Sequence, residues 1–335
     1  MRWAGRYLAA KPAPPPLHAR RLSLDDPAYR ALWAESPQRS AFAHPAFVHA
    51  VGDAFGLETG VALGVADGGA LAAALPLFER KRGPFRALVV PPLVPFVSPL
   101  LAGPLCEDRV HRRTSPLDRL LEAVATEYDR ATLLLHPSLT DARPLTWAGW
   151  QVRPRYTYTL DLGDDDLLAR WSGGTRRTAS KAAGAYTFEE HPDLAEEAFA
   201  RMRASYDRQS EPFDVEPEAV RTLLASLHAA GLVRAFGVRT EAGAVEAAVA
   251  VAHDGRAAHY WIAGSRPGPA MTVLLARLLP RLREDGLHTF DFQGANVPSI
   301  AEFKRRFGPV LTPYTLAQRD FHPALRALGR LRGHG

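Results

Sequence analysis

The sequence predicts an α+β (mixed α/β) fold made of two similar halves, each with a mostly antiparallel sheet flanked by helices. The chain has 335 residues, about twice the ~150 residues of a typical domain. Helical and strand patterns follow one another in both halves, in the same broad order. No literal repeat accompanies this order, so the duplication is inferred from the elements alone.

The first half is predicted to begin with a proline-rich arm over residues 1–16. Two helices, a hairpin of two strands, a third helix and a strand follow, at residues 22–33, 45–55, 60–66 with 70–78, 115–128 and 131–135. The uncharged run 87–106 is long enough to cross a membrane as a helix of ~20 residues. Its prolines would break such a helix, so we interpret it as buried strand and irregular backbone.

The second half is predicted to contain a strand, two short and two longer helices, a three-stranded meander, a helix, a strand, a helix and a final strand. These elements are expected at 156–162, 164–171, 176–183, 193–206, 217–230, 232–238, 245–251, 257–262, 271–285, 288–292, 300–307 and 312–316. Gly173 and Gly174 are expected to end the first short helix, and Thr175 to cap the second. Pro280 is expected to kink or shorten its helix.

Composition indicates a folded globular protein and excludes several classes of site. Apolar residues make up 47% and charged residues 23% of the chain, with a net charge of +5, which permits an anionic substrate without requiring one. The single cysteine, Cys106, excludes an internal disulfide and is interpreted as a free buried thiol rather than a nucleophile. The N-terminus lacks the apolar core of a secretion signal, so a cytoplasmic location is expected.

Motifs for nucleotide hydrolysis, dinucleotide binding, serine hydrolysis and zinc peptidases are absent from the sequence. The passage from strand 257–262 through a Gly- and Pro-containing loop into the next helix remains. Such a turn aims the first helical amides at the loop and suits an anion, to which Arg266 would add a charge-assisted bond. An ordinary strand-to-helix connection is the alternative interpretation.

This order of elements, with five segments, resembles the Fem-like (FemABX) branch of the GNAT acyltransferase superfamily. The segments are 157–162, 171–177 with Lys181, 260–264, 291–296 and 302–308. The resemblance implies two GNAT-like halves, with the two central strands of the second splayed apart around the arm of an acyl donor. Several members of that branch transfer an amino acid from aminoacyl-tRNA to a peptidoglycan precursor.

The resemblance also suggests the donor. In the GNAT superfamily the donor-binding loop reads Arg/Gln-x-x-Gly-x-Gly/Ala, and Arg266, Gly268 and Ala270 match it with one residue too few. This spacing disfavours ordinary CoA binding. No bound cofactor or metal is expected, and the donor is aminoacyl-tRNA or acyl-CoA.

Three residues are the catalytic candidates. Lys304 is one of only four lysines, and the resemblance places it beside the reacting carbonyl, where it would stabilise an oxyanion. Its alternative role is a solvated helix charge. Tyr260 is expected to face the strand gap and Trp261 the opposite face, although aromatic strand residues are also common in cores. Asp291 would orient the acceptor amine or act as a base; alternatively it caps a turn or pairs with Arg305.

The remaining candidates would bind substrate, or would form a solvated basic face and ordinary turns. They are Arg176, Arg177, Lys181, Tyr206, Arg208, Gln293, Asn296 and Arg305. The loop 210–215 is expected to cover the acceptor pocket.

We divide the chain into an arm (1–16), a degenerate GNAT-like domain (17–150), an acyltransferase domain (151–320) and a basic tail (321–335). The leading hypothesis is transfer of an acyl or aminoacyl group to the amine of a small molecule or cell-wall precursor. Transfer from acyl-CoA to a sugar, lipid or small-molecule precursor is the second hypothesis, and an idle binding protein of this fold is the third. No DNA partner or transmembrane segment is expected, and tRNA is a possible donor; the sequence leaves the oligomeric state open.

Overall fold

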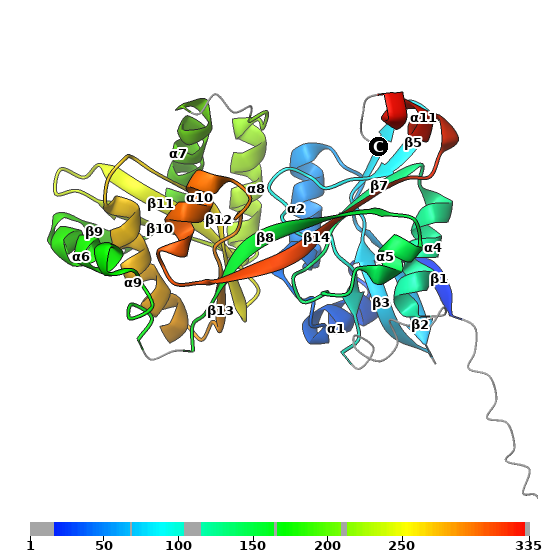
Figure 1. Ribbon diagram of the computed structural model, residues 1–335, viewed down its shortest axis with the longest axis horizontal. Helices are drawn as coiled ribbons and strands as arrows, with labels where there is room; N and C mark the ends of the chain where they lie inside the picture. The colour runs from blue at the N-terminus through cyan, green and yellow to red at the C-terminus, as the bar shows by residue number, and fades with distance from the viewer. Residues whose placement is uncertain (1–16, 68, 104–114, 164–165, 209–212, 332–335) are drawn as a thin grey trace, which may run out of the picture.

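The structure, a computed structural model, describes residues 17–67, 69–103, 115–163, 166–208 and 213–331. Two lobes lie side by side and are connected by a long two-stranded ribbon (Figure 1). The ribbon consists of β8 (Gln151–Asp161) and β14 (Val310–Asp320), which run antiparallel. The predicted mixed α/β class with two lobes is confirmed.

The first lobe is built on a four-stranded antiparallel sheet of order β1-β2-β3-β6. Its strands are β1 (His18–Ser23), β2 (Val61–Asp67), β3 (Ala70–Pro76) and β6 (Leu100–Leu101). Its helical elements are α1 (Pro27–Glu35), η1 (Ala41–Ala43), α2 (Pro45–Phe55), α4 (Pro116–Glu127) and α5 (Arg143–Trp147). The α4 helix begins where Ser115 and Asp118 form a reciprocal capping box.

The second lobe contains the predicted antiparallel meander of β10 (Val233–Arg239), β11 (Val245–His253) and β12 (Ala257–Ser265), flanked by β9 (Thr187–Glu190) and β13 (Thr289–Asp291). Its helical elements are α6 (Gly173–Ala182), η2 (Ala183–Ala185), α7 (Leu194–Arg208), α8 (Pro217–Ala229), α9 (Ala270–Glu284) and α10 (Pro298–Arg305). The helix α11 (Pro323–Leu331) follows the ribbon.

One sheet runs through both lobes. Among the described residues its order is β4-β5-β7-β14-β8-β13-β12-β11-β10-β9, where β4 (Glu79–Arg82), β5 (Phe85–Leu88) and β7 (Arg130–Leu134) belong to the first half. The final strand, β14, pairs with β7 on one side and β8 on the other. The division near residue 150 remains a prediction, because the hydrogen-bonded sheet is continuous across it.

Alternation along β11 divides the second lobe into two cores. Ala248, Ala250 and Ala252 face α7, α8 and the first lobe, whereas Val249 and Val251 face α9. The register between β11 and β12 shifts at Trp261, which is the extra residue of a β-bulge. The neighbouring strand β12, which carries Tyr260, is likewise buried on both faces, with Ile262 in one core and Ala258 in the other.

Specific side-chain contacts join the lobes. The Trp261 indole nitrogen donates to the Leu93 carbonyl oxygen at 2.6 Å. The Arg39 guanidinium lies over the Trp33 ring and pairs with the buried Asp254 carboxylate, with Nε 3.2 Å from Oδ2. Because α2 also packs against α8, the first lobe covers one face of the second (Figure 1).

Some predicted helix boundaries were wrong, because a strand or a capping side chain occupies the expected first or last residues. The helix expected at 22–33 begins only at Pro27, because Leu22 belongs to β1 and Asp26 caps the helix. Within the described part of 164–171 the chain forms a turn rather than a helix. Its expected end, Gly173, instead begins α6.

The caps and interior of two further helices also differ from expectation. Ser172, not Thr175, caps α6, and its hydroxyl accepts from the Thr175 amide at 3.3 Å. Pro280 does not shorten α9, which continues to Glu284. A proline in a helix interior costs about 3 kcal/mol, but α9 buries a full apolar face on both sides of Pro280.

The uncharged run 87–106 is buried strand and irregular backbone over its described part, as predicted. Val94, Phe96, Val97 and Leu100 from this run lie in the core. Cys106 lies outside the described residues. Among the helices that the structure describes, none is long and apolar enough to span a membrane.

Gly264 on β12 sets the distance between this strand and α7. A Cβ at this position would lie 2.5 Å from the Met202 amide nitrogen and 2.6 Å from the Arg201 carbonyl carbon, both backbone atoms. Gly264→Ala should lower the free energy of unfolding by about 1–3 kcal/mol, as overpacking does. Gly184→Ala, where a Cβ meets nothing within 4 Å, is the matched control. Urea titration of both variants checks this, and equal stabilities would contradict the close approach.

Candidate active site

The candidate active site lies where β12 and β13 diverge. These parallel strands pair only from Ala257 with Thr289 to His259 with Asp291. Beyond that point β12 continues to Ser265, whereas β13 ends at Asp291. The splayed central strands expected from the sequence are therefore present, and Tyr260 and Asp291 lie at the fork.

Lys304 is a buried cation at this fork, not a solvated helix charge. Its side chain extends from α10 so that Nζ donates to the Gln293 carbonyl at 2.6 Å and to the Gly294 carbonyl at 3.3 Å. The residue is 7% exposed, and Nζ lies 5.3 Å from the centroid of the Tyr260 ring. Burial lowers the pKa of Lys304 from 10.5 to about 8, and the charge of Asp291 opposes that shift.

Asp291 is the acidic group of the fork. Its Oδ1 accepts hydrogen bonds from the Thr157 hydroxyl and, at 2.7 Å, from the Gln293 amide. Burial raises the pKa of Asp291 from 3.8 to about 6, although these two hydrogen bonds and the charge of Lys304 lower it. Arg305 pairs with Glu302 instead, so the alternative of an Asp291–Arg305 pair was wrong.

The two aromatic residues of β12 face opposite sides, as strand alternation predicts. Trp261 packs toward the first lobe, where its ring meets Phe47. Tyr260 is partly buried on the other side, against the rings of Phe290 and Phe292 and beneath Lys304. Burial raises the pKa of Tyr260, so this phenol stays protonated at neutral pH.

The loop after β13 shapes the site through its backbone. Gln293 adopts a positive φ of 57°, which is uncommon for a non-glycine residue. Asn296 exchanges hydrogen bonds with the backbone of Tyr156, at 2.9 and 3.0 Å. Sequence reasoning identified both residues but missed Thr157 and His259, which bond to Asp291 and Gln293 from neighbouring strands.

A pocket of about 740 Å³ opens between the starts of α6 and α9 and the end of α10. Its lining comprises Ser172, Gly174, Thr175, Thr178, Gly268, Pro269, Thr272, Glu302, Phe303, Arg305, Arg306 and Phe307. Two helix N-termini therefore face it together, and α9 begins without a side-chain cap. Thr272, which is only 8% exposed, contributes a hydroxyl-bearing side chain to this lining. Helix amides, a hydroxyl and arginines suit a phosphate.

The predicted donor-binding residues lie at the start of α9. Gly268 lines the pocket with φ at 141°, and Ala270 is the buried first residue of the helix. Arg266 lies outside the lining, with its side chain largely exposed and paired with Glu246 at 3.1 Å. Among the predicted substrate-binding residues, Arg305 lines the same pocket.

Five further predicted substrate-binding residues lie outside both the fork and the pocket lining. Arg176, Arg177 and Lys181 are exposed on α6, beside Gly174, Thr175 and Thr178, which line the pocket. Tyr206 and Arg208 end α7, where the Tyr206 ring packs on Phe213. Residues 209–212 of the expected acceptor-covering loop lie outside the described residues.

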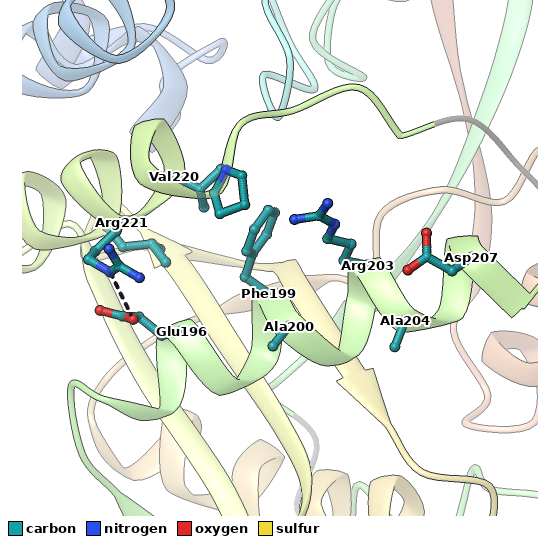
Figure 2. Close-up of a pocket in the computed structure, with 10 residues that line it drawn as sticks. Glu196, Phe199, Ala200, Arg203, Ala204, Asp207, Val220 and Arg221 are labelled. Carbon is teal, nitrogen blue, oxygen red and sulfur yellow. Dashed lines mark hydrogen bonds and ion pairs between the residues drawn. The ribbon is translucent and has the colours of Figure 1, made fainter.

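A smaller hollow of about 270 Å³ separates α7 from α8. Figure 2 shows Phe199 and Val220 at its centre, with the Glu196–Arg221 ion pair at one end and Arg203 and Asp207 at the other. None of the predicted site residues lines it.

Comparisons with known proteins agree with this geometry. Residues 170–305 match the family model for an acetyltransferase (GNAT) domain. No curated protein matches the sequence. Solved structures share the fold over almost the whole chain, and FemX is among them, so the predicted resemblance to the Fem-like branch is confirmed at the level of the fold.

FemX has a TM-score of 0.70 and 13% identity, over 93% of this chain and 99% of that one. A tandem GNAT protein from the clavulanic acid biosynthesis pathway has a TM-score of 0.55 and 16% identity, over 92% and 99%. L-PGS from Bacillus licheniformis has a TM-score of 0.55 and 12% identity, over 89% and 93%. At these identities the likeness concerns the fold, and the roles of individual site residues remain predictions.

The raised pKa of Asp291 predicts a pH-dependent cost in stability. The Asp291 carboxyl binds its proton more tightly in the folded protein than in the unfolded chain. Protonation of Asp291 therefore stabilises the fold, fully below pH 3.8 and progressively less as the pH rises through about 6. Asp291→Asn removes the effect. Relative to the unsubstituted protein, the variant should therefore gain on the order of 2–3 kcal/mol between about pH 4 and pH 7.

Urea titrations at both pH values measure this gain. The matched control is Asp53→Asn, because Asp53 is an exposed carboxylate on α2. Its relative stability should change little across the same pH range. A relative stability of Asp291→Asn that stays constant or falls with pH would contradict the assignment.

Proposed function

We propose that this chain, whose residues 170–305 match a GNAT acetyltransferase domain, is an acyltransferase that acts on an amine acceptor. The acceptor amine attacks an activated acyl or aminoacyl ester held where β12 and β13 diverge. The observation that carries the proposal is the buried ammonium of Lys304 at this fork. Buried ionisable groups with shifted pKa values cluster at functional sites, so this placement favours catalysis over an idle binding protein.

Lys304 is suited to stabilise the tetrahedral intermediate. A lysine ammonium has three N–H groups, and two of them are directed at the Gln293 and Gly294 carbonyls. The third remains for the oxygen of the acyl carbonyl, which becomes negative when the amine attacks. Because the ammonium is held in place before the negative charge develops, it stabilises the transition state without reorganisation.

Asp291 is placed to receive or orient the acceptor amine. With its pKa near 6, the carboxylate is ionised at neutral pH and attracts an ammonium. Oδ1 accepts the hydrogen bonds from Thr157 and Gln293, so Oδ2, which lies 3.9 Å from His259 Nδ1, is the oxygen left for the amine. Asp291 takes one proton from the ammonium, so that the neutral amine attacks the acyl carbon. Collapse of the intermediate then breaks the bond to the leaving oxygen or sulfur of the donor, which takes the second proton lost by the nitrogen, and an amide is formed.

The pocket between α6, α9 and α10 supports a phosphate-bearing donor. Both aminoacyl-tRNA and acyl-CoA carry phosphates, although in acyl-CoA the pantetheine arm separates them from the thioester. The lining offers helix amides, Thr272, Arg305 and Arg306. The start of α6 forms one wall of this pocket, opposite the loop that precedes α9. We place aminoacyl transfer first, because that loop has one residue fewer than the usual CoA-binding pattern.

Acyl-CoA is the second candidate donor, and the match of residues 170–305 to an acetyltransferase domain favours it. The acceptor would then be a sugar, lipid or small-molecule amine. We place either reaction in the cytoplasm, where both donors occur.

Lys304→Ala should lower kcat by about 10²–10³-fold, the usual cost of removing one oxyanion donor. The control is Lys81→Ala, because Lys81 is exposed on β4 in the first lobe and pairs there with Glu58. Mass spectrometry of acyl transfer from acetyl-CoA or a charged tRNA to an amine-bearing peptidoglycan precursor supplies the rates. Equal turnover by Lys304→Ala and the unsubstituted protein would remove Lys304 from the mechanism.

Donor binding should raise the melting temperature by about 2–5 °C at saturating concentration, because a ligand bound only by the folded state stabilises it. Thr272→Val keeps the shape of the side chain but loses the hydroxyl, and it should weaken this effect about 3–10-fold in apparent affinity. Stabilisation by CoA with none by charged tRNA would reject the aminoacyl donor. No stabilisation by either would reject the pocket as the donor site.

A further inference from the structure

His259 is a buried histidine that the proposed reaction does not use. It follows Ala258 on β12, is 3% exposed, and is the last residue of that strand to pair with β13. Its ring meets two rings of the first lobe edge-on, with centroids 4.8 Å from Phe42 and 6.1 Å from Phe96. Burial lowers the pKa of His259 to about 3, so the imidazole is neutral.

One hydrogen bond fixes the state of this imidazole. The side-chain amide nitrogen of Gln293 lies 2.9 Å from His259 Nδ1. An amide N–H only donates, so Nδ1 accepts and the ring proton is on Nε2. Nε2 is buried and has no hydrogen-bond partner among the described residues. The hydrogen bond that this ring makes is therefore the one that Nδ1 accepts from the Gln293 side chain.

Gln293 links His259 to both charged groups of the fork. Its backbone amide donates to Asp291 Oδ1 at 2.7 Å, and its backbone carbonyl accepts from Lys304 Nζ at 2.6 Å. The backbone holds these two contacts at a φ of 57°, which a non-glycine residue keeps only when its surroundings enforce it. The bond from the side chain to His259 anchors this conformation from the opposite face of the sheet.

We propose that His259 is a positioning residue for acyl transfer: it holds the Gln293 side chain, and thereby the Gln293 carbonyl that receives the Lys304 ammonium. The first lobe takes part, because Phe42 and Phe96 fix the imidazole ring. The importance of this arrangement for turnover rests on the proposed function. The arrangement itself does not, and it can be tested without a substrate.

Two substitutions separate positioning from packing. His259→Phe keeps an aromatic ring against Phe42 and Phe96 but removes the acceptor. His259→Asn loses the ring but retains an acceptor oxygen close to the position of Nδ1. If His259 serves only in packing, His259→Asn should disturb Lys304 more than His259→Phe does. If His259 is a positioning residue, His259→Phe should disturb Lys304 more.

The pKa of Lys304 is the readout, measured by NMR on protein labelled only at lysine side chains. The chain has four lysines, Lys11, Lys81, Lys181 and Lys304, so the spectrum has few signals and Lys304→Arg identifies the one of interest. Thermal melting of both His259 variants reports packing in the same samples. Lys81 and Lys181, which are both exposed, serve as internal controls.

We expect the pKa of Lys304 to move by at least half a pH unit in His259→Phe and to stay within a quarter of a unit in His259→Asn, even where the latter melts at a lower temperature. An unchanged pKa in His259→Phe, or an equal shift in both variants, would overturn the proposal. If Lys304→Ala retained full turnover while this pattern held, the proposed function would fail and the positioning role of His259 would stand.

Discussion

The buried ammonium of Lys304 is the constraint on which the rest of the site depends. A cation removed from water must be compensated, and here the compensation comes from two backbone carbonyls, the Tyr260 ring and the charge of Asp291. The carbonyls reach Nζ only because Gln293 adopts a left-handed conformation directly after β13. The pairing of β12 with β13 stops beside this charge, which is where the proposed function places the acyl group.

The fork also separates two kinds of contact onto the two faces of the sheet. On one face lie α6, α9 and α10, with a pocket rich in amides and arginines that suits the phosphates of a donor. On the other face lie His259, Thr157 and the first lobe, which hold Gln293 and Asp291. Although the first half lacks a counterpart of the Phe-Lys-Arg-Arg segment, it supports the site through Phe42 and Phe96 and through the β14 strand that both lobes share.

Sequence patterns predicted the elements with strong periodicity and the residues of the most specific segment. The apolar stripe of α9 and the meander β10–β12 follow from such patterns, and the resemblance to the Fem-like branch suggested Lys304 and Asp291. Other features depend on tertiary contacts. The pairing of β14 with β7 and the contacts of Thr157, His259 and Thr272 arise where strands and helices distant in sequence meet. One signal for His259 was available: a histidine in the apolar run before Tyr260 is buried on one face by alternation.

The central claim is that Lys304 stabilises the charge of a tetrahedral intermediate, and binding of a phosphonate that mimics this intermediate tests it most directly. Calorimetry would compare the phosphonate with the planar amide product, in the unsubstituted protein and in Lys304→Ala. Transition-state analogues bind at least about 10²-fold more tightly than ground-state ligands, so we expect that preference in the unsubstituted protein and its loss in the variant. Equal loss of affinity for the phosphonate and the amide, or no loss for either, would contradict the account.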